Sequence, residues 1–273
     1  MERLYNLKIV RSGNRVELYK YNSFLKIGSE CTNKKGRKSD EITKEKKIIN
    51  KRLNLNRSRN KIIRLCSCNK DLTTFITLTY KNNFQDYKKS KYHLNYFLKK
   101  FKDLKYIYVL ELQSRGAIHY HLLCNLSIDF KTSHKGHKSQ IQKDYERQFA
   151  SKYWKHGFVD IRNLKSECDT NVGKYLSSYM VKGLLNKDLQ GVRCFGYSRN
   201  LLKPIEEKII FRGNIIELLK DYKVSYINTY QVRYIDKHGK ERINKVDYYD
   251  LEVRNEDRKR DINTQCYWKE KDR

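Results

Sequence analysis

Several features that define common protein classes are missing from this chain of 273 residues. No stretch approaches the roughly 20 apolar residues that a membrane-spanning helix needs, and the N-terminus, Met1 to Leu4, lacks the apolar region of a secretory signal. The seven cysteines are an odd number without a repeated Cys-x-x-Cys pattern, which argues against a disulfide framework and against a zinc ribbon. We therefore expect a cytoplasmic protein with reduced thiols and no membrane partner.

The charge of the chain is strongly one-sided. Sixty Lys and Arg residues stand against thirty-one Asp and Glu residues, which gives a formal net charge of +29. A chain this basic is attracted to polyanions and releases their counterions when it binds them. Nucleic acid is the first candidate, and an acidic membrane surface is the main alternative.

The pattern along the chain predicts one catalytic domain with two extensions. Residues 1–70 are predicted to form a hairpin and a basic helical arm, residues 71–204 the catalytic domain, and residues 205–273 a small C-terminal appendage with a charged tail. The arm, whose basic residues lie between 34 and 64, is either a solvated helix or a segment that grips phosphates. The sequence leaves both interpretations open.

Strand-like and helix-like patterns alternate through the catalytic domain. Phe75 to Tyr80 alternates as a strand does, and apolar residues at three- and four-residue steps between Leu94 and Leu104 predict an amphipathic helix. Further strands are predicted over residues 105–113, 117–126 and 157–163, and further helices over 140–154 and 169–182. This order predicts an α+β fold, in which helices cover one face of a central antiparallel sheet and the open face takes the substrate.

His119 and His121 are the first candidates for a functional site. Side chains two apart on a strand share a face, so the two imidazoles lie side by side while Ile118, Tyr120 and Leu122 point into the core. A divalent ion could bind there. For an isolated His-x-His pair, two histidines satisfied by hydrogen bonds are the more common finding.

Glu111, on the preceding strand, is the expected third ligand. A three-residue loop, Arg115-Gly116-Ala117, would pair Glu111 with His121 and Gln113 with His119, which makes Gln113 the fallback. Two imidazoles and an oxygen ligand suit Mg²⁺ or Mn²⁺, although imidazole also accepts Zn²⁺ or Ni²⁺ in vitro.

Four residues near this site are expected to contact DNA. Thr77 and Thr79 lie on a strand that would neighbour the histidines, where their hydroxyls could reach a phosphate or a metal-bound water; ordinary strand filler is an equally good interpretation of each threonine. Arg115 and Lys174 are the basic members of this set.

Tyr175, Tyr179 and Lys182 stand at positions i, i+4 and i+7 of a predicted helix and so share one face. A phenol with a pKa of about 10 is a poor nucleophile at neutral pH, and the ion and Lys182 are the cations that could favour the phenolate. Attack on a phosphodiester would give a covalent phosphotyrosine. In a chain with 22 tyrosines, packing is the simpler explanation of a pair at this spacing.

Three motifs in this order resemble those of the HUH endonuclease superfamily. They are Phe75-Ile-Thr-Leu-Thr-Tyr80, then Arg115-Gly-Ala-Ile-His119-Tyr-His121-Leu-Leu, and then Tyr179-Met-Val-Lys182. The resemblance covers residues 73 to 204 and is closest to rolling-circle replication initiators of small plasmids and single-stranded DNA phages, including the filamentous-phage gene II type.

The resemblance implies a nickase that depends on a metal ion and acts on single-stranded DNA at a replication origin in a bacterial host. It makes His119 and His121 metal ligands, Tyr179 the nucleophile, Lys182 its helper and Tyr175 the first residue of a two-tyrosine pair. Ser178 departs from the lysine common in that subgroup. No Gly-Lys-Ser/Thr loop is present, so a host helicase and a host DNA polymerase are the expected partners.

Two other functions compete with this interpretation. A transposase or relaxase of the same superfamily would use the same residues. A non-enzymatic protein that binds single-stranded nucleic acid would use interleaved tyrosines and lysines for stacking and phosphate contacts, and it would leave the two histidines and Glu111 without a role.

Overall fold

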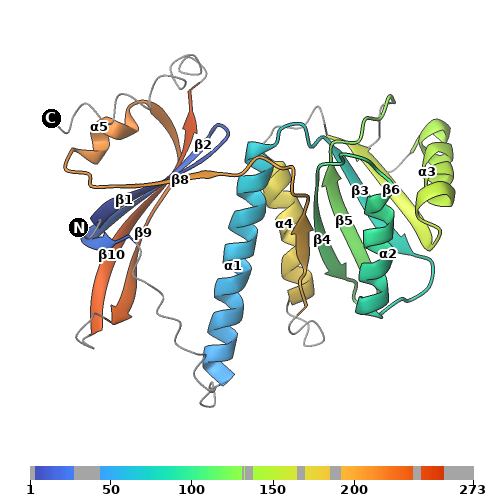
Figure 1. Cartoon of the computed structure of the whole chain (residues 1–273), viewed down its shortest axis with the longest axis horizontal. Coiled ribbons are helices and arrows are strands. Elements are labelled where there is room, and N and C mark those ends of the chain that lie inside the picture. The colour runs from blue at the N-terminus through green and yellow to red at the C-terminus, as the bar shows by residue number, and fades with distance from the viewer. Residues whose placement is uncertain are drawn as a thin grey trace. The chain divides into compact units, whose positions relative to one another are not determined.

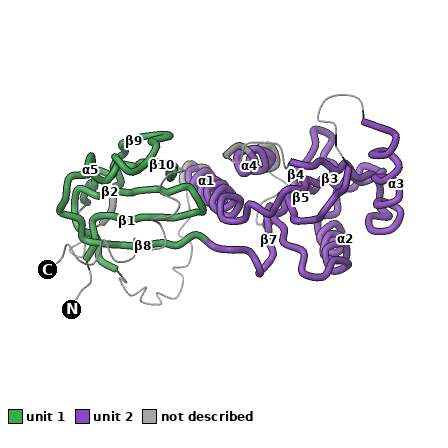
Figure 2. The backbone as a smooth tube through the Cα atoms, turned by 90° about the horizontal axis from the view of Figure 1, so that it is seen from above, with its two compact units in different colours: residues 1–41, 204–273 green, residues 42–203 purple. Residues whose placement is uncertain are grey.

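The structure, a computed structural model, describes residues 4–27, 44–130, 132, 138–164, 170–184, 192–235 and 241–254. The chain forms two compact units, shown in different colours in Figure 2. We call residues 42–203 the central unit, and residues 1–41 with 204–273 the terminal unit. Each unit has its own sheet.

The described part of the central unit contains a five-stranded antiparallel sheet and four helices. The strand order is β6-β3-β5-β4-β7. The strands are β3 Thr74–Tyr80, β4 Tyr106–Leu112, β5 Ile118–Cys124, β6 Gly157–Asn163 and β7 Phe195–Tyr197, and the helices are α1 Lys44–Cys68, α2 Tyr87–Lys99, α3 Gln140–Tyr153 and α4 Thr170–Leu184. The α+β class and the antiparallel sheet are confirmed.

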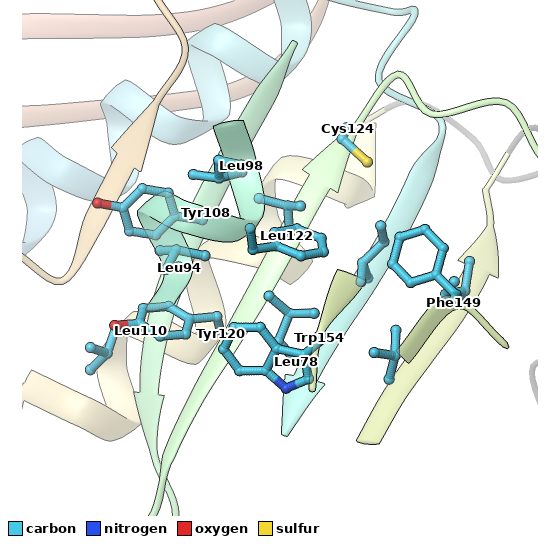
Figure 3. Close-up of a cluster of buried hydrophobic side chains, with 14 of the residues drawn as sticks. Leu78, Leu94, Leu98, Tyr108, Leu110, Tyr120, Leu122, Cys124, Phe149 and Trp154 are labelled. Carbon is cyan, nitrogen blue, oxygen red and sulfur yellow. The ribbon is translucent and has the colours of Figure 1, made fainter. Parts of the chain in front are cut away.

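One face of this sheet is an apolar core closed by α2 and α3. Tyr120 and Leu122 of β5 are fully buried in it, as the alternation predicts, together with Leu94 and Phe97 of α2 (Figure 3). The α2 helix begins at Asp86, whose carboxylate accepts the Lys89 N–H. Its apolar stripe turns toward the strands because residues three and four apart share one side of a helix.

The opposite face of the sheet also carries helices. Leu176 of α4 and Ile62 and Leu65 of α1 are buried with Phe75, Val109 and other apolar residues of the strands, and Figure 1 shows α1 and α4 on the side of the sheet away from α2 and α3. The expectation of helices on one face only is therefore corrected. The apolar strand residues on this face need cover, and α4 supplies it over part of the surface.

Gly173 explains how closely α1 and α4 approach each other. A Cβ added to this glycine would lie 3.0 Å from the Ile63 Cα and 3.2 Å from the Cys66 Cβ. A larger residue would push the two helices apart, and with them the residues that α4 holds over the sheet.

The terminal unit joins both ends of the chain in a second antiparallel sheet. Its strand order is β8-β1-β2-β10-β9, and Leu218 of the short helix α5 packs on its apolar face. The elements are β1 Leu4–Ser12, β2 Arg15–Lys26, β8 Ile205–Ile209, α5 Ile215–Leu219, β9 Tyr222–Ile235 and β10 Glu241–Val253.

The grouping of segments differs from the three-part division expected from the sequence. The N-terminal hairpin pairs with β10 and β8, whereas α1, expected in the N-terminal part, packs with α4 in the central unit. The boundary near residue 204 coincides with the expected one. Strand pairing between residues more than 200 positions apart is not visible in local patterns. Among the described helices, none is both long and apolar enough to cross a bilayer.

Candidate active site

The polar residues of the second sheet face form two neighbouring rows across the strands. In one row Thr79 pairs with His119, and His119 pairs with Glu111. In the next row Thr77 pairs with His121. Directly opposed residues of antiparallel strands share a face, so the register alone brings these side chains together beside α4.

The turn between β4 and β5 differs from the expected one by two residues in register. Gln113 pairs with Ala117 by a hydrogen bond of 3.0 Å, so the three-residue loop is Ser114-Arg115-Gly116, and Gly116 takes a φ of +81°. The expected loop, Arg115-Gly116-Ala117, and the pairing of Glu111 with His121 are wrong. Glu111 stays on the predicted face because a shift of two preserves the side of the sheet.

His121 is held from two sides. Its Nδ1 lies 3.3 Å from the Thr77 hydroxyl, and its Nε2 lies 2.6 Å from Oε2 of Glu111. Glu111 reaches diagonally from its own row to make this hydrogen bond. His121 is 5% exposed, so the position of its ring is fixed by these contacts and by the rings stacked against it.

His119 is held from one side and open on the other. Its Nδ1 lies 3.5 Å from the Thr79 hydroxyl, while its buried Nε2 has no hydrogen-bond partner. Burial lowers the pKa of His119; the neighbouring His121 lowers it further, Glu111 raises it, and Arg115 lowers it again. The imidazole is therefore neutral at pH 7, and a buried nitrogen lone pair without a partner is costly unless something binds there.

The residues present suit a divalent ion, although the structure does not group them as a finished site. In the described part of the chain no three His, Cys, Asp or Glu side chains are gathered closely enough to hold a metal. However, each imidazole is held at Nδ1 by a threonine of β3, which is the outer contact that metal-binding histidines usually have. The partnerless Nε2 of His119 lies in the row of Glu111, the oxygen donor of the set.

Tyr179 lies directly over His121. Their ring centroids are 3.7 Å apart with the planes at 23°. The Tyr179 hydroxyl donates a hydrogen bond of 2.5 Å to the Tyr175 hydroxyl, and Phe75 of β3 packs against the rings of Tyr175 and Tyr179, at 5.4 and 6.2 Å respectively. Helix α4 thus presents the tyrosine pair to the histidine face, while Leu176 anchors the helix in the apolar part of the same face.

The surroundings of Tyr179 favour its neutral form. Burial raises the pKa of this phenol above its ordinary value, the hydrogen bond and charge of Tyr175 raise it further, and so does the Glu111 carboxylate; the Arg162 guanidinium lowers it. The phenol is therefore protonated at pH 7. Additional positive charge near its oxygen would be needed to make it an effective nucleophile.

Arg162 is a site residue that the sequence reasoning missed. It stands on β6 opposite Phe75, and its Nε binds Oδ2 of Asp160 at 3.0 Å. Burial lowers its pKa, but Asp160, Tyr175 and Tyr179 raise it, and the net shift is upward. Arg162 is thus a permanent cation that interacts with both phenols. The alternation of Phe158, Asp160 and Arg162 was visible in the sequence; the pairing of β6 with β3 was not.

The other predicted residues lie around this centre. Arg115 is exposed in the turn, where it lines an open hollow with Glu111 and Gln113. Lys174 is exposed on α4. Lys182 belongs to the same helix, but its side chain lies outside the described part. The hydroxyls of Thr77 and Thr79, expected to reach DNA or a water, instead contact the imidazoles.

Comparison with known proteins identifies a class that fits this fold and site. Residues 73–184, which hold all three motifs, match the family model described as replication-associated protein ORF2 or gene II protein. This match supports the predicted resemblance to gene II-type replication proteins, while membership of the HUH superfamily stays a prediction.

One particular relative extends the same conclusion. The chain is 25% identical over 175 residues to the Phasyl DNA replicon protein arp of Escherichia coli. The similarity covers 57% of this chain and 60% of the relative, so the chain spans about three fifths of that protein's length. No solved structure matches the chain.

Proposed function

We propose that this protein initiates rolling-circle DNA replication by nicking and rejoining single-stranded DNA through a covalent bond to Tyr179. The observation that carries the proposal is the stacking of the Tyr179 ring on His121, 3.7 Å away, beside a buried imidazole nitrogen that lacks a partner. The similarity to replication-associated proteins supports the biological setting. Origin DNA would be the substrate, and a host helicase and polymerase would extend the product.

His119, His121 and Glu111 would hold Mg²⁺ or Mn²⁺. The ion would compete with the hydrogen bond between His121 and Glu111 and would use the open Nε2 of His119. When bound, it would polarise a nonbridging phosphate oxygen and orient the scissile bond. Thr77 and Thr79 would fix the ring planes from behind, because each contacts the nitrogen on the other side of an imidazole.

Tyr179 would attack phosphorus while the bond from phosphorus to the 3′ oxygen breaks. The new bond joins the Tyr179 oxygen to the 5′ phosphate, the leaving 3′ oxygen takes up a proton, and the phenol proton passes to Tyr175, whose hydroxyl accepts it in the resting structure. Tyr175 is 42% exposed and can release that proton to water. Arg162 would stabilise the developing phenolate. The reverse transfer rejoins the strand without another energy source.

Covalent capture of DNA tests this proposal. The full chain would be incubated with Mn²⁺ and a single-stranded oligonucleotide, labelled on the 3′ side, from the replicon that encodes it, and then denatured. We expect a labelled protein band that disappears with EDTA and in Tyr179→Phe. Binding without any adduct in the wild-type chain would instead support the non-enzymatic binder.

A parallel measurement tests the ligand set and the choice of tyrosine. Mn²⁺ binding, followed by calorimetry in the absence of DNA, should weaken in His119→Ala and in Glu111→Gln while the melting temperature without metal stays close to that of the wild type. An adduct that survives in Tyr179→Phe but is lost in Tyr175→Phe would transfer the nucleophilic role to Tyr175.

A further inference from the structure

One aromatic ring on the histidine face is unusually exposed. Phe158 of β6 pairs with Thr79, which pairs with His119, so the three residues lie in one row of the sheet. Phe158 is 62% exposed. Two strand spacings separate it from His119, a distance of about 10 Å. A large apolar ring left in water on an otherwise polar face is not explained by packing in this unit.

Phe158 borders a hollow with a basic wall. Lys81, at the end of β3, and Lys143, Arg147 and Lys155, on α3 and in the turn after it, line this hollow together with the Phe158 ring. Among the described lining residues Glu146 is acidic, and it is paired with Lys138 at 2.7 Å. Four cations therefore surround an exposed ring, which is complementary to a ligand that carries both phosphates and flat bases.

The turn that carries these groups is rigidly attached to β3. A Cβ on Gly157 would lie 2.3 Å from the Thr79 carbonyl oxygen and 2.4 Å from the Lys81 nitrogen, so only glycine fits there. The Lys81 N–H donates to the His156 carbonyl at 3.0 Å, and the Trp154 indole donates to the Thr79 carbonyl at 3.1 Å. Phe158 and Lys81 are thus held in place before any ligand binds, which lowers the entropy lost on binding.

We propose that this hollow binds the single-stranded DNA beside the scissile phosphate, with one base stacked on Phe158 and the flanking phosphates paired with Lys81 and Lys155. The inference deepens the proposed function and rests on it for the identity of the ligand. Single-stranded rather than duplex DNA is favoured because a base can stack on a protein ring only when it has left its own stack.

Binding without cleavage tests the site directly. The full-length Tyr179→Phe protein would be titrated into fluorescein-labelled oligothymidylate in EDTA, with anisotropy as the readout. Phe158→Ala should weaken binding about 5- to 100-fold, the effect of removing one stacked base, whereas Phe158→Trp should retain it and show fluorescence quenching by DNA beyond that of the parent. Lys155→Gln should lower the slope of log affinity against log salt by about 1.

Tyr92→Ala is the matched control, since Tyr92 is 69% exposed on α2 and does not line the hollow. Its affinity should equal that of the parent. An unchanged affinity in Phe158→Ala, an equal loss in Tyr92→Ala, or an equal loss of affinity for duplex DNA would each overturn the inference. Because Phe158 is largely exposed, the melting temperature of Phe158→Ala should match that of its parent.

The outcomes separate this site from the nicking proposal. If the wild-type chain forms the Tyr179 adduct while Phe158→Ala binds oligothymidylate normally, the stacking site fails and the nicking proposal stands. If no adduct forms but Phe158→Ala loses affinity and Tyr92→Ala does not, the stacking site stands and the nicking proposal fails.

Discussion

The two faces of the central sheet show how one set of strands can serve stability on one side and chemistry on the other. On the α2 and α3 side, Tyr120 and Leu122 are completely buried in a continuous apolar cluster. On the α4 side, apolar strand residues such as Val109 anchor the helix, and the rows beyond them turn polar at His119 and His121. The difference teaches that α4 needs only part of its face for docking, which leaves Tyr175 and Tyr179 over the histidines.

The largest expected effect separates two tyrosines on opposite faces. Tyr179→Phe should reduce adduct formation by at least about 1,000-fold, because the nucleophilic oxygen is gone. Tyr120→Phe removes a hydroxyl 2.9 Å from the Ser90 hydroxyl in the opposite core and should cost about 1 kcal/mol of stability while the adduct forms at a normal rate. Quantitative gels and urea unfolding measure the two quantities, and loss of the adduct in Tyr120→Phe would break the comparison.

Two phenylalanines should show the opposite ranking. Phe97→Ala should lower the free energy of unfolding by about 3–5 kcal/mol because Phe97 is fully buried between α2 and the sheet. Phe75→Leu, in contrast, should cost no more than about 1.5 kcal/mol but should slow adduct formation, since Phe75 packs against both tyrosine rings. Urea unfolding and rates per folded molecule test both variants; an unimpaired rate in Phe75→Leu would show that the tyrosines do not need this ring.

Two threonines of the same strand allow an identical substitution at the site and away from it. Thr77→Val removes the contact with His121 and should reduce activity or metal affinity about 10- to 100-fold, as loss of an outer contact to a ligand does. Thr74→Val removes a hydrogen bond of 2.6 Å to the Leu126 carbonyl and should cost about 1–3 kcal/mol of stability with the rate per folded molecule unchanged. Equal loss of activity in both would mean that Thr77 has no special role.

The smallest expected effect concerns the charge beside the tyrosines. Because the pKa of Tyr179 lies above the ordinary phenol value, its neutral form dominates at pH 7, and the rate of adduct formation should rise with pH, by at most about tenfold per unit. Arg162→Gln removes a cation that lowers this pKa, so the profile should move to higher pH and the rate at pH 7 should fall several-fold. Arg212→Gln, in the terminal unit, is the control for net charge. A flat profile would show that deprotonation of the phenol does not limit the step.

Much of the site was predictable because it depends on periodicity. The two-residue repeat of β5 predicted that His119 and His121 share a face opposite Tyr120, and the helical repeat predicted that Tyr175 and Tyr179 lie one above the other. Both hold in the structure, where Tyr120 is buried in the first core and the two phenols are hydrogen-bonded. The α+β class followed from the order of the same patterns.

Other features required contacts that no local pattern encodes. The register of Glu111 depended on which residues form a three-residue loop, and the helices on the second face depended on how α1 meets α4 at Gly173. The pairing of the N-terminal hairpin with strands after residue 204 lies beyond the reach of sequence periodicity.

The sequence by itself determined the chemistry of the side chains and the face on which each one stands, because strand and helix repeats fix direction over a few residues. Only the tertiary structure decided that Arg162 accompanies the tyrosines, that Glu111 binds His121 diagonally, and that Phe158 stands exposed in the row of His119. These relations come from the pairing of strands distant in the chain, and such pairing is selected by the packing of the whole sheet rather than by any one segment.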